Sequence, residues 1–145
     1  MTGAVPSLDI ERACRELVLR AARCADAGDA AGLAQLFAPD GILVRPNAQP
    51  LQGRTAIEAA YAQRPADRLT RHLVTNTLVE IESPSSARAL SYVLLWTGSS
   101  TDPEGLRGRP AHAGPLVGEF DDRFTLGPEG WRIQRRDARF VLHSG

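Results

Sequence analysis

The periodicity of the apolar residues changes near Pro65, and this change constrains the fold more than any other feature of the sequence. Before it, apolar residues recur three or four positions apart, which is the period of an amphipathic helix. After it, four runs rich in Val, Ile, Leu and aromatic residues partly alternate with polar ones, as β-strands do. Helices followed by strands predict an α+β fold, with the helices packed on one face of a mixed or antiparallel sheet.

The N-terminal half is expected to hold three helices and one short strand. A first helix ends at Gly28, and Asp29 is a suitable N-cap for a second, short helix. A Pro-Asp-Gly turn closes that helix, and residues 41–45 then form a strand. The third helix is predicted to begin at Thr55, because Thr55 and Glu58 have the spacing of a capping box.

The C-terminal half predicts four strands in an antiparallel meander. The strands are expected at residues 72–82, 87–98, 117–126 and 131–142. One connection, residues 99–116, spans eighteen residues, far beyond the ~2–5 residues of an ordinary hairpin loop. Two interpretations are open for this loop: an ordered cover over a site, or a disordered insertion.

Composition limits the partners of this chain. Its 145 residues fit one domain, 1–145, with a single core. Seventeen basic and seventeen acidic residues give no net charge, so nothing favours nucleic acid or an anionic membrane as a partner. The N-terminus lacks a basic start followed by an apolar run, and no stretch approaches the ~18 apolar residues of a membrane span. We therefore expect a soluble, cytoplasmic protein that binds a small molecule.

Neither the cysteines nor the histidines predict a metal site. Cys14 and Cys24 lie ten residues apart on one predicted helix, about 15 Å along its axis, which is too far for a disulfide. We expect buried thiols. The histidines at 72, 112 and 143 are not accompanied by ligands at metal-binding spacing. No metal and no cofactor is expected.

Four motifs follow one another along the chain: ADAGDAAGLAQLFAPDGIL, QGRTAIEAAY, RHLVTNTLVEI and GWRIQRRDARF. Their succession resembles the SnoaL-like branch of the nuclear transport factor 2-like superfamily. The resemblance runs from about Asp9 to Phe140 and implies a cone: a bent, mainly antiparallel sheet wrapped on three helices around an apolar pocket. Composition and periodicity alone predict only α+β.

The superfamily hosts several activities, so individual residues must select among them. Ketosteroid isomerases of this superfamily carry a general-base aspartate and an oxyanion-binding tyrosine where this sequence has Arg45 and Ala21. A guanidinium cannot abstract a proton, and a methyl group cannot donate one. The isomerase pattern of that group is therefore absent.

The resemblance to dehydrochlorinases and scytalone dehydratase-like enzymes is sharper. In these, an aspartate near the end of the first helix partners a histidine, and in the dehydrochlorinase an arginine on the last strand assists. Asp26, His72 and Arg136 occupy the matching positions. The lysine of the dehydrochlorinase pattern falls near Ala21 and the tyrosine of the dehydratase corresponds to Ala25, so neither specific activity is transferred.

These three residues suit proton abstraction. An imidazole with a reference pKa of ~6.5 is a good base near pH 7, and a carboxylate on its other nitrogen fixes the tautomer. In this hypothesis Asp26 orients, His72 abstracts, and Arg136 stabilises an enolate or a departing anion. The sequence thus predicts a cofactor-independent lyase or isomerase acting on a small hydrophobic, cyclic or polyketide-like substrate. The alternative is a non-catalytic ligand-binding module or an assembly subunit with the same fold.

Each of the three residues also has a purely structural interpretation. Asp26 suits a solvated turn at the helix end, His72 a hydrogen-bonded position on a half-buried strand face, and Arg136 an exposed, arginine-rich strand face. Strand alternation places His72 on the same face as Asn76 and Leu78.

Four further residues are candidates for ligand binding: Asn76, Tyr92, Trp96 and Phe120. The amide of Asn76 could donate to a ligand carbonyl or satisfy a strand irregularity, and the three aromatic residues suit either the core or a pocket wall. A homodimer or homotrimer is expected, because an open curved sheet leaves an apolar outer face that a partner covers.

Overall fold

The computed structural model describes residues 4–112 and 114–145, and in this part the chain forms three helices and six strands. The helices are α1 (Ala4–Ala27), α2 (Ala30–Gln35) and α3 (Arg54–Ala62), and the strands are β1 (Phe37–Val44), β2 (Leu51–Gln52), β3 (Arg68–Ser83), β4 (Ser86–Ser99), β5 (Leu116–Gly127) and β6 (Gly130–His143). The predicted α+β class is confirmed. All four strands predicted for the C-terminal half are present, each slightly longer than its apolar run.

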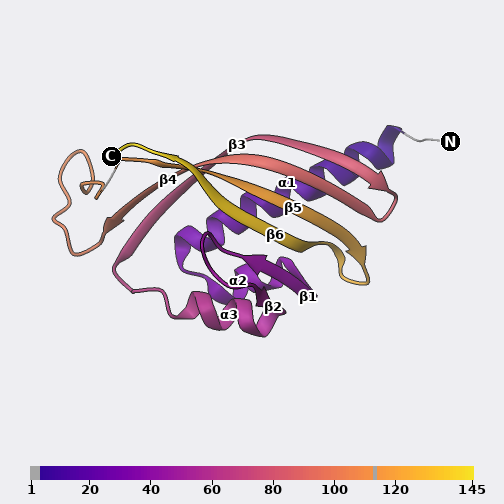
Figure 1. Cartoon of the computed structure of the whole chain (residues 1–145), viewed down its shortest axis with the longest axis horizontal. Coiled ribbons are helices and arrows are strands. Elements are labelled where there is room, and N and C mark those ends of the chain that lie inside the picture. Colours follow the sequence, from indigo (N-terminus) through magenta and orange to yellow (C-terminus); the bar gives the residue numbers. More distant parts are fainter. Residues whose placement is uncertain (1–3, 113) are drawn as a thin grey trace.

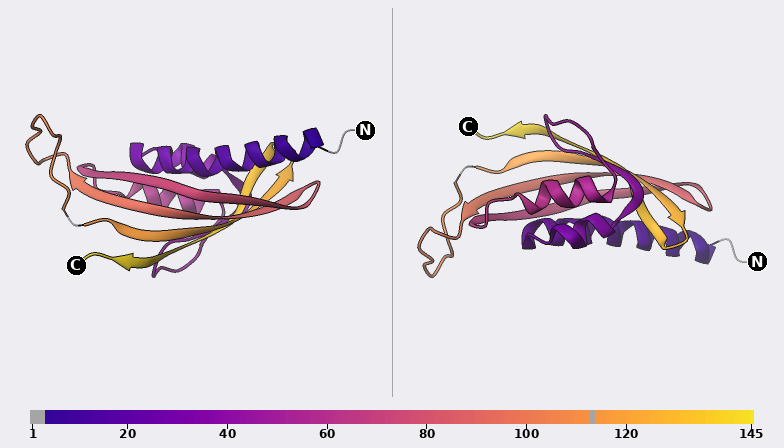
Figure 2. Two further views of the ribbon diagram at one scale, coloured as in Figure 1. Left: turned by 90° about the horizontal axis from the view of Figure 1, so that it is seen from above. Right: turned by 90° about the horizontal axis from the view of Figure 1, so that it is seen from below.

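The six strands form one sheet in the order β2-β1-β6-β5-β4-β3. Strands β3 to β6 are an antiparallel meander, as predicted, whereas β1 pairs with β6 in parallel. Figure 1 shows α1 crossing behind the long strands, and Figure 2 shows that all three helices lie on the same side of β5 and β6. The curved sheet therefore has a helix-covered face and an open outer face.

The core forms where α1 meets the covered face of the sheet. Four α1 side chains at helical spacing, Cys14, Leu17, Val18 and Ala21, are 0–6% exposed. They belong to one apolar cluster, completed by Leu33, Ala34, Phe37, Leu43, Ile57, Ala87, Ala89, Phe124 and Ile133. Burial, with a smaller contribution from the charge of Asp122, raises the pKa of the Cys14 thiol to about 12. Cys24 is half-buried, and both cysteines are free thiols.

The predicted N-terminal cap is confirmed for α2 and is wrong for α3. The backbone N–H of Gly32 donates to Asp29 Oδ1 at 2.8 Å, so Asp29 caps α2 as predicted. The capping box at Thr55 is wrong: α3 begins at Arg54, and its N-cap Gly53 makes no side-chain cap bond. The chain enters α3 directly from β2 with Gly53 at a φ of 87°, a conformation that glycine adopts without strain.

The predicted strand at 41–45 is longer and starts earlier, at Phe37. Pro39, Asp40 and Gly41 therefore lie within β1 rather than in a turn after α2. The parallel pairing with β6 shifts register between Phe37 and Ile42, so this Pro-Asp-Gly sequence marks an irregularity in an edge region of the sheet.

Strand β3 contains a β-bulge, and the residues after the bulge lie on the opposite face from the one that strict alternation predicts. The pairing with β4 shifts register between Thr75 and Leu78, and Asn76 there adopts a φ of 57°. Val74 before the bulge and Val79 after it both pack against the core, although strict alternation separates them. The prediction that Leu78 shares a face with His72 is wrong, because Leu78 follows the bulge and is 73% exposed.

The long connection between β4 and β5 extends beyond the end of the sheet (Figure 1). It returns to the sheet at His112, whose backbone N–H donates to the Thr97 carbonyl at 2.9 Å, while the His112 ring contacts Asp102 at 2.7 Å. Within the described residues, no helix has the length and apolar character needed to cross a bilayer.

Candidate functional site

A cavity of about 490 Å³ lies between the helices and the covered face of the sheet. Such a volume fits a small organic ligand. The α1 helix contributes only small side chains, Ala21, Ala22 and Ala25, and β5 contributes Gly118 beside Phe120. These small residues leave a space that larger side chains would fill. None of the described residues 100–112, 114 and 115 lines the cavity, so the long loop does not cover it in this structure.

Asp26 is held in the last turn of α1 by hydrogen bonds from the first part of β3. Its side chain is 13% exposed. Its Oδ1 accepts from the hydroxyl of Thr70 at 2.9 Å, and its Oδ2 accepts from the backbone N–H of His72 at 3.0 Å. These two donors fix the carboxylate, and the interpretation of Asp26 as a solvated turn residue is wrong.

The carboxylate of Asp26 also contacts the His72 ring, with Nδ1 and Oδ1 2.6 Å apart. An ionised carboxylate can only accept, so Nδ1 carries the proton in this contact, and in the neutral imidazole Nε2 then keeps its lone pair. Burial favours a higher pKa for Asp26, but the hydrogen bonds from His72 and Thr70 outweigh it and hold the pKa below its usual value. Asp26 is therefore an ionised acceptor at neutral pH.

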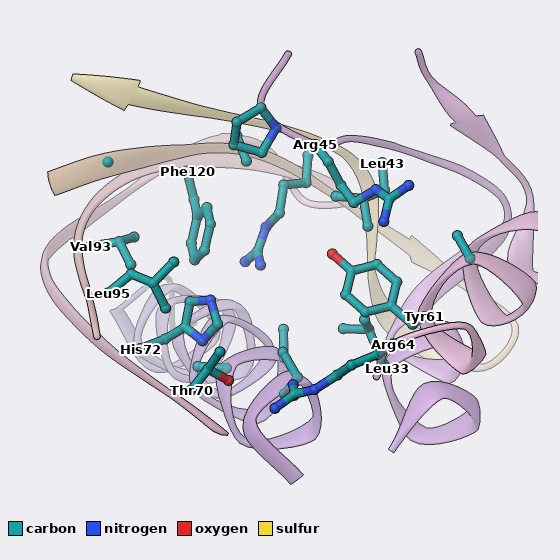
Figure 3. A pocket seen from close by; sticks show the side chains of 18 of the residues that line it. Leu33, Leu43, Arg45, Tyr61, Arg64, Thr70, His72, Val93, Leu95 and Phe120 are labelled. Carbon is teal, nitrogen blue, oxygen red and sulfur yellow. The ribbon is translucent and has the colours of Figure 1, made fainter. Parts of the chain in front are cut away.

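His72 presents its ring to the cavity. Figure 3 shows the imidazole next to Phe120, Leu95 and Val93, with Thr70 below it. The ring centroids of His72 and Phe120 are 6.5 Å apart. The arrangement therefore combines a ring nitrogen free to accept a proton with an apolar wall.

Arg136 lies on β6, is 5% exposed and lines the same cavity. Its Nε and Nη2 donate to the two oxygens of Asp122 at 2.7 and 2.9 Å, and its guanidinium carbon lies 3.9 Å from the centroid of the Phe120 ring. The side chain of Asp122 is 0% exposed. The interpretation of Arg136 as an exposed surface residue is therefore wrong, and its charge is balanced by a buried carboxylate.

Three of the four candidate ligand-binding residues do not line the cavity, which corrects the expectation for them. Phe120 lines it, but Tyr92 and Trp96 point to the opposite face of β4 from the lining residues Val93 and Leu95. Tyr92 is 47% exposed. Asn76 is exposed at the bulge of β3, where its positive φ suits the structural interpretation.

Several residues of the site, three in the cavity lining and one behind it, were not predicted from the sequence. Thr70 is two residues before His72, so strand alternation could have found it. Asp122 lies between Phe120 and Phe124 on the same face of β5, which the same rule predicts. Arg45 and Tyr61 also line the cavity, and only the way that β1 and α3 pack against the sheet brings them there.

Among the residues that the structure describes, no group of three or more His, Cys, Asp or Glu side chains is close enough to hold a metal ion. The cavity is bounded instead by apolar residues, by arginines and by a few other polar side chains, among them Tyr61, Glu119 and His72 with Asp26 behind it.

The fold and the site define a class: a cone-shaped α+β domain with a carboxylate–imidazole pair in the wall of an internal cavity. The chain belongs to the SnoaL-like domain family, whose model matches residues 6–137, and it has the cone fold of the nuclear transport factor 2-like superfamily. No curated protein matches the chain.

Solved structures confirm the fold. A putative scytalone dehydratase from Novosphingobium aromaticivorans is 21% identical, with a TM-score of 0.81 over 97% of this chain and 90% of that chain. An NTF2-like protein from the same species is 25% identical, with a TM-score of 0.77 over 99% and 89%. A hexachlorocyclohexane dehydrochlorinase, LinA type 2, is 12% identical, with a TM-score of 0.81 over 97% and 91%.

Proposed function

We propose that this protein is a cofactor-independent lyase or isomerase that removes a proton from a carbon atom of a small hydrophobic, cyclic or polyketide-like substrate, with Asp26 and His72 as its general-base pair. The observation that carries the proposal is the 2.6 Å contact between Asp26 Oδ1 and His72 Nδ1 in the wall of a cavity large enough for such a molecule. A coarser lyase-type role agrees with the dehydratase and dehydrochlorinase among the structural neighbours.

In the proposed elimination, His72 Nε2 takes a proton from a substrate carbon. The electron pair of that C–H bond forms a C=C bond, and the leaving group departs with the electrons of its own bond. Asp26 holds the imidazole in the required tautomer and stabilises the imidazolium that forms. The imidazolium then returns its proton to the leaving group or to water. In an isomerisation the proton returns to another carbon of the substrate.

Arg136 is proposed to stabilise the negative charge that develops on the substrate. Asp122 occupies Nε and Nη2, while guanidinium N–H groups remain for the ligand because Arg has five donors. Preorganised donors of this kind give large contributions to rate when they face developing charge. The bidentate bond to Asp122 and the stacking on Phe120 fix the direction of those donors.

The proposal is tested with two classes of compound, cyclic β-hydroxy ketones and polychlorinated cyclohexanes. Elimination is followed by mass spectrometry of the alkene product and by chloride release, and proton abstraction alone is followed by deuterium incorporation in D₂O. For a compound that wild type turns over, His72→Ala is expected to lower kcat by roughly 10²–10⁴-fold. Asp26→Asn is expected to lower it as well, because the amide no longer fixes the tautomer of His72.

The chain offers a matched control. His112 and Asp102 form a second imidazole–carboxylate contact at 2.7 Å, but the His112 side chain is 51% exposed and lies outside the cavity. His112→Ala should leave kcat unchanged. An equal rate in His72→Ala and wild type would refute the general-base role. Ligand binding without elimination or exchange in any compound would favour the non-catalytic binding module instead.

A further inference from the structure

The cavity carries positive charge that the protein does not balance. Five arginines and one glutamate line it. Arg136 is paired with Asp122, and Nε of Arg139 donates to Glu119 Oε1 at 2.9 Å. In the described part of the chain, no carboxylate lies within ion-pair distance of the other three lining arginines, which are Arg45, Arg64 and Arg68.

Of these three, Arg45 is the one whose hydrogen-bonding capacity is unused. The guanidinium of Arg64 donates to the backbone carbonyls of Ala25 and Arg68, and Arg68 is exposed. Arg45 is half-buried, and its Nε is a buried donor with no hydrogen-bond partner among the described residues. A buried donor without an acceptor costs free energy, and in native structures it calls for a specific explanation.

The position of Arg45 is fixed by its neighbours. It follows β1 directly, two residues after Leu43, which pairs with Arg136 of β6 and lines the cavity. Its guanidinium carbon lies 5.5 Å from the centroid of the Tyr61 ring, within the range of a cation–π contact. Figure 3 shows Arg45 and Tyr61 on one side of the cavity, with the Tyr61 hydroxyl turned toward the interior, and His72 with Phe120 on the other side.

Tyr61 is suited to donate next to Arg45. Burial raises the pKa of its phenol, and the charges of the surrounding arginines, Arg136 foremost, act in the opposite direction without cancelling the rise. The hydroxyl therefore keeps its proton at neutral pH. A guanidinium and a phenol O–H on one wall form a set of donors that suits an anionic oxygen.

We propose that Arg45, assisted by the hydroxyl of Tyr61, binds an anionic oxygen group of the ligand, a carboxylate or a phenolate, and so makes the cavity selective for apolar organic anions. This inference rests on the proposed function in one respect, that the cavity is the substrate site, and it names the substrate class. The apolar body of the ligand lies against Phe120, Val93 and Leu95, and its anionic end lies across the cavity from His72.

The test compares two probes that differ in charge, 2-naphthoate and the neutral 2-naphthamide, by isothermal titration calorimetry at low ionic strength. Wild type is expected to bind naphthoate roughly 10- to 100-fold more tightly than the amide, the range of a charge-assisted hydrogen bond. Arg45→Gln should lose this preference, and Arg45→Lys should keep part of it because the charge remains. Added salt should reduce the preference of wild type.

The control variant is Arg123→Gln, which removes one positive charge from an exposed position of β5 outside the cavity. It should keep the full preference for naphthoate. Circular dichroism and thermal unfolding of Arg45→Gln and Arg45→Lys check that these variants are folded.

The outcomes separate this inference from the proposed function. His72→Gln should retain the preference for naphthoate, since Arg45 is unchanged in it. A preference that depends on Arg45, together with turnover that does not depend on His72, would refute only the catalytic role. Equal affinity of wild type for the two probes, no binding of naphthoate, or a preference that survives in Arg45→Gln would overturn the role of Arg45.

Discussion

Asp122→Ala is expected to destabilise the protein severely, because it removes one half of a buried ion pair. The side chains of Arg136 and Asp122 are 6% and 0% exposed, and two hydrogen bonds of 2.7 and 2.9 Å join them. Without Asp122, the guanidinium of Arg136 stays buried with no balancing charge. Breaking a buried pair in this way typically costs about 3–5 kcal/mol.

The size of the expected effect follows from the length of the chain. Unfolding entropy near 60 °C is about 2.1 cal/mol/K per residue, which for 145 residues gives about 0.3 kcal/mol/K. A loss of about 3–5 kcal/mol therefore lowers Tm by about 10–16 °C. Urea unfolding followed by tryptophan fluorescence measures the same change, since Trp131 packs against the core.

Two further variants test whether the loss of stability comes from the unbalanced charge of Arg136 or from any removal of a carboxylate. Asp137→Ala removes the partner of Arg135, but these side chains are 46% and 42% exposed, so the cost should stay below about 1 kcal/mol. The double replacement Asp122→Val with Arg136→Met should recover most of the stability, because it removes both charges and keeps the combined side-chain volume nearly the same. A cost for Asp122→Ala no larger than that for Asp137→Ala would refute the reasoning.

Two other predictions concern pH and self-association. Burial favours a higher pKa for Asp26, but hydrogen bonds from His72 and Thr70 hold the pKa below the unfolded value of about 3.9. Ionised Asp26 therefore stabilises the fold above that pH. This stabilisation is lost as the pH falls through the pKa of the folded state. The difference in unfolding free energy between wild type and Asp26→Asn should therefore shrink between pH 7 and pH 3, and a constant difference in urea titrations would contradict this. On the outer face of β3 and β4, Leu73 is 50% exposed and Tyr92 is 47% exposed. We therefore predict that the protein forms a homodimer or homotrimer through this face, and that Leu73→Glu weakens the association. Light scattering after gel filtration measures this, and a wild-type monomer at every concentration would exclude it.

The local order of the elements could be read from the sequence because it depends on local chemistry. The period of the apolar residues in α1 reports the face that meets the sheet, and Gly28 and Asp29 set the boundary to α2 through backbone preferences of those residue types. The meander follows from consecutive strand patterns joined by turns. The resemblance to the SnoaL-like family added the curvature of the sheet, which no local pattern contains.

The placement of Asp26 beside His72 could be proposed from the sequence only through that resemblance. A helical wheel leaves Asp26 at the margin of the apolar stripe, so periodicity permits burial without requiring it. What keeps the carboxylate there is a set of donors 44 and 46 residues away, the Thr70 hydroxyl and the His72 backbone and ring.

The sequence by itself determined the three helices, the five longer strands and their order, because each depends on preferences of residues close together in the chain; the two-residue strand β2 was not predicted. Only the tertiary structure decided which face each side chain occupies after the bulge at Asn76, that Asp122 balances the charge of Arg136, and that Arg45 reaches the cavity. A single extra residue in a strand inverts every position that follows, and contacts between distant elements depend on the packing of the whole sheet. For that reason, the acid–base pair could be proposed from the sequence, whereas the unpaired arginine across the cavity from it could not.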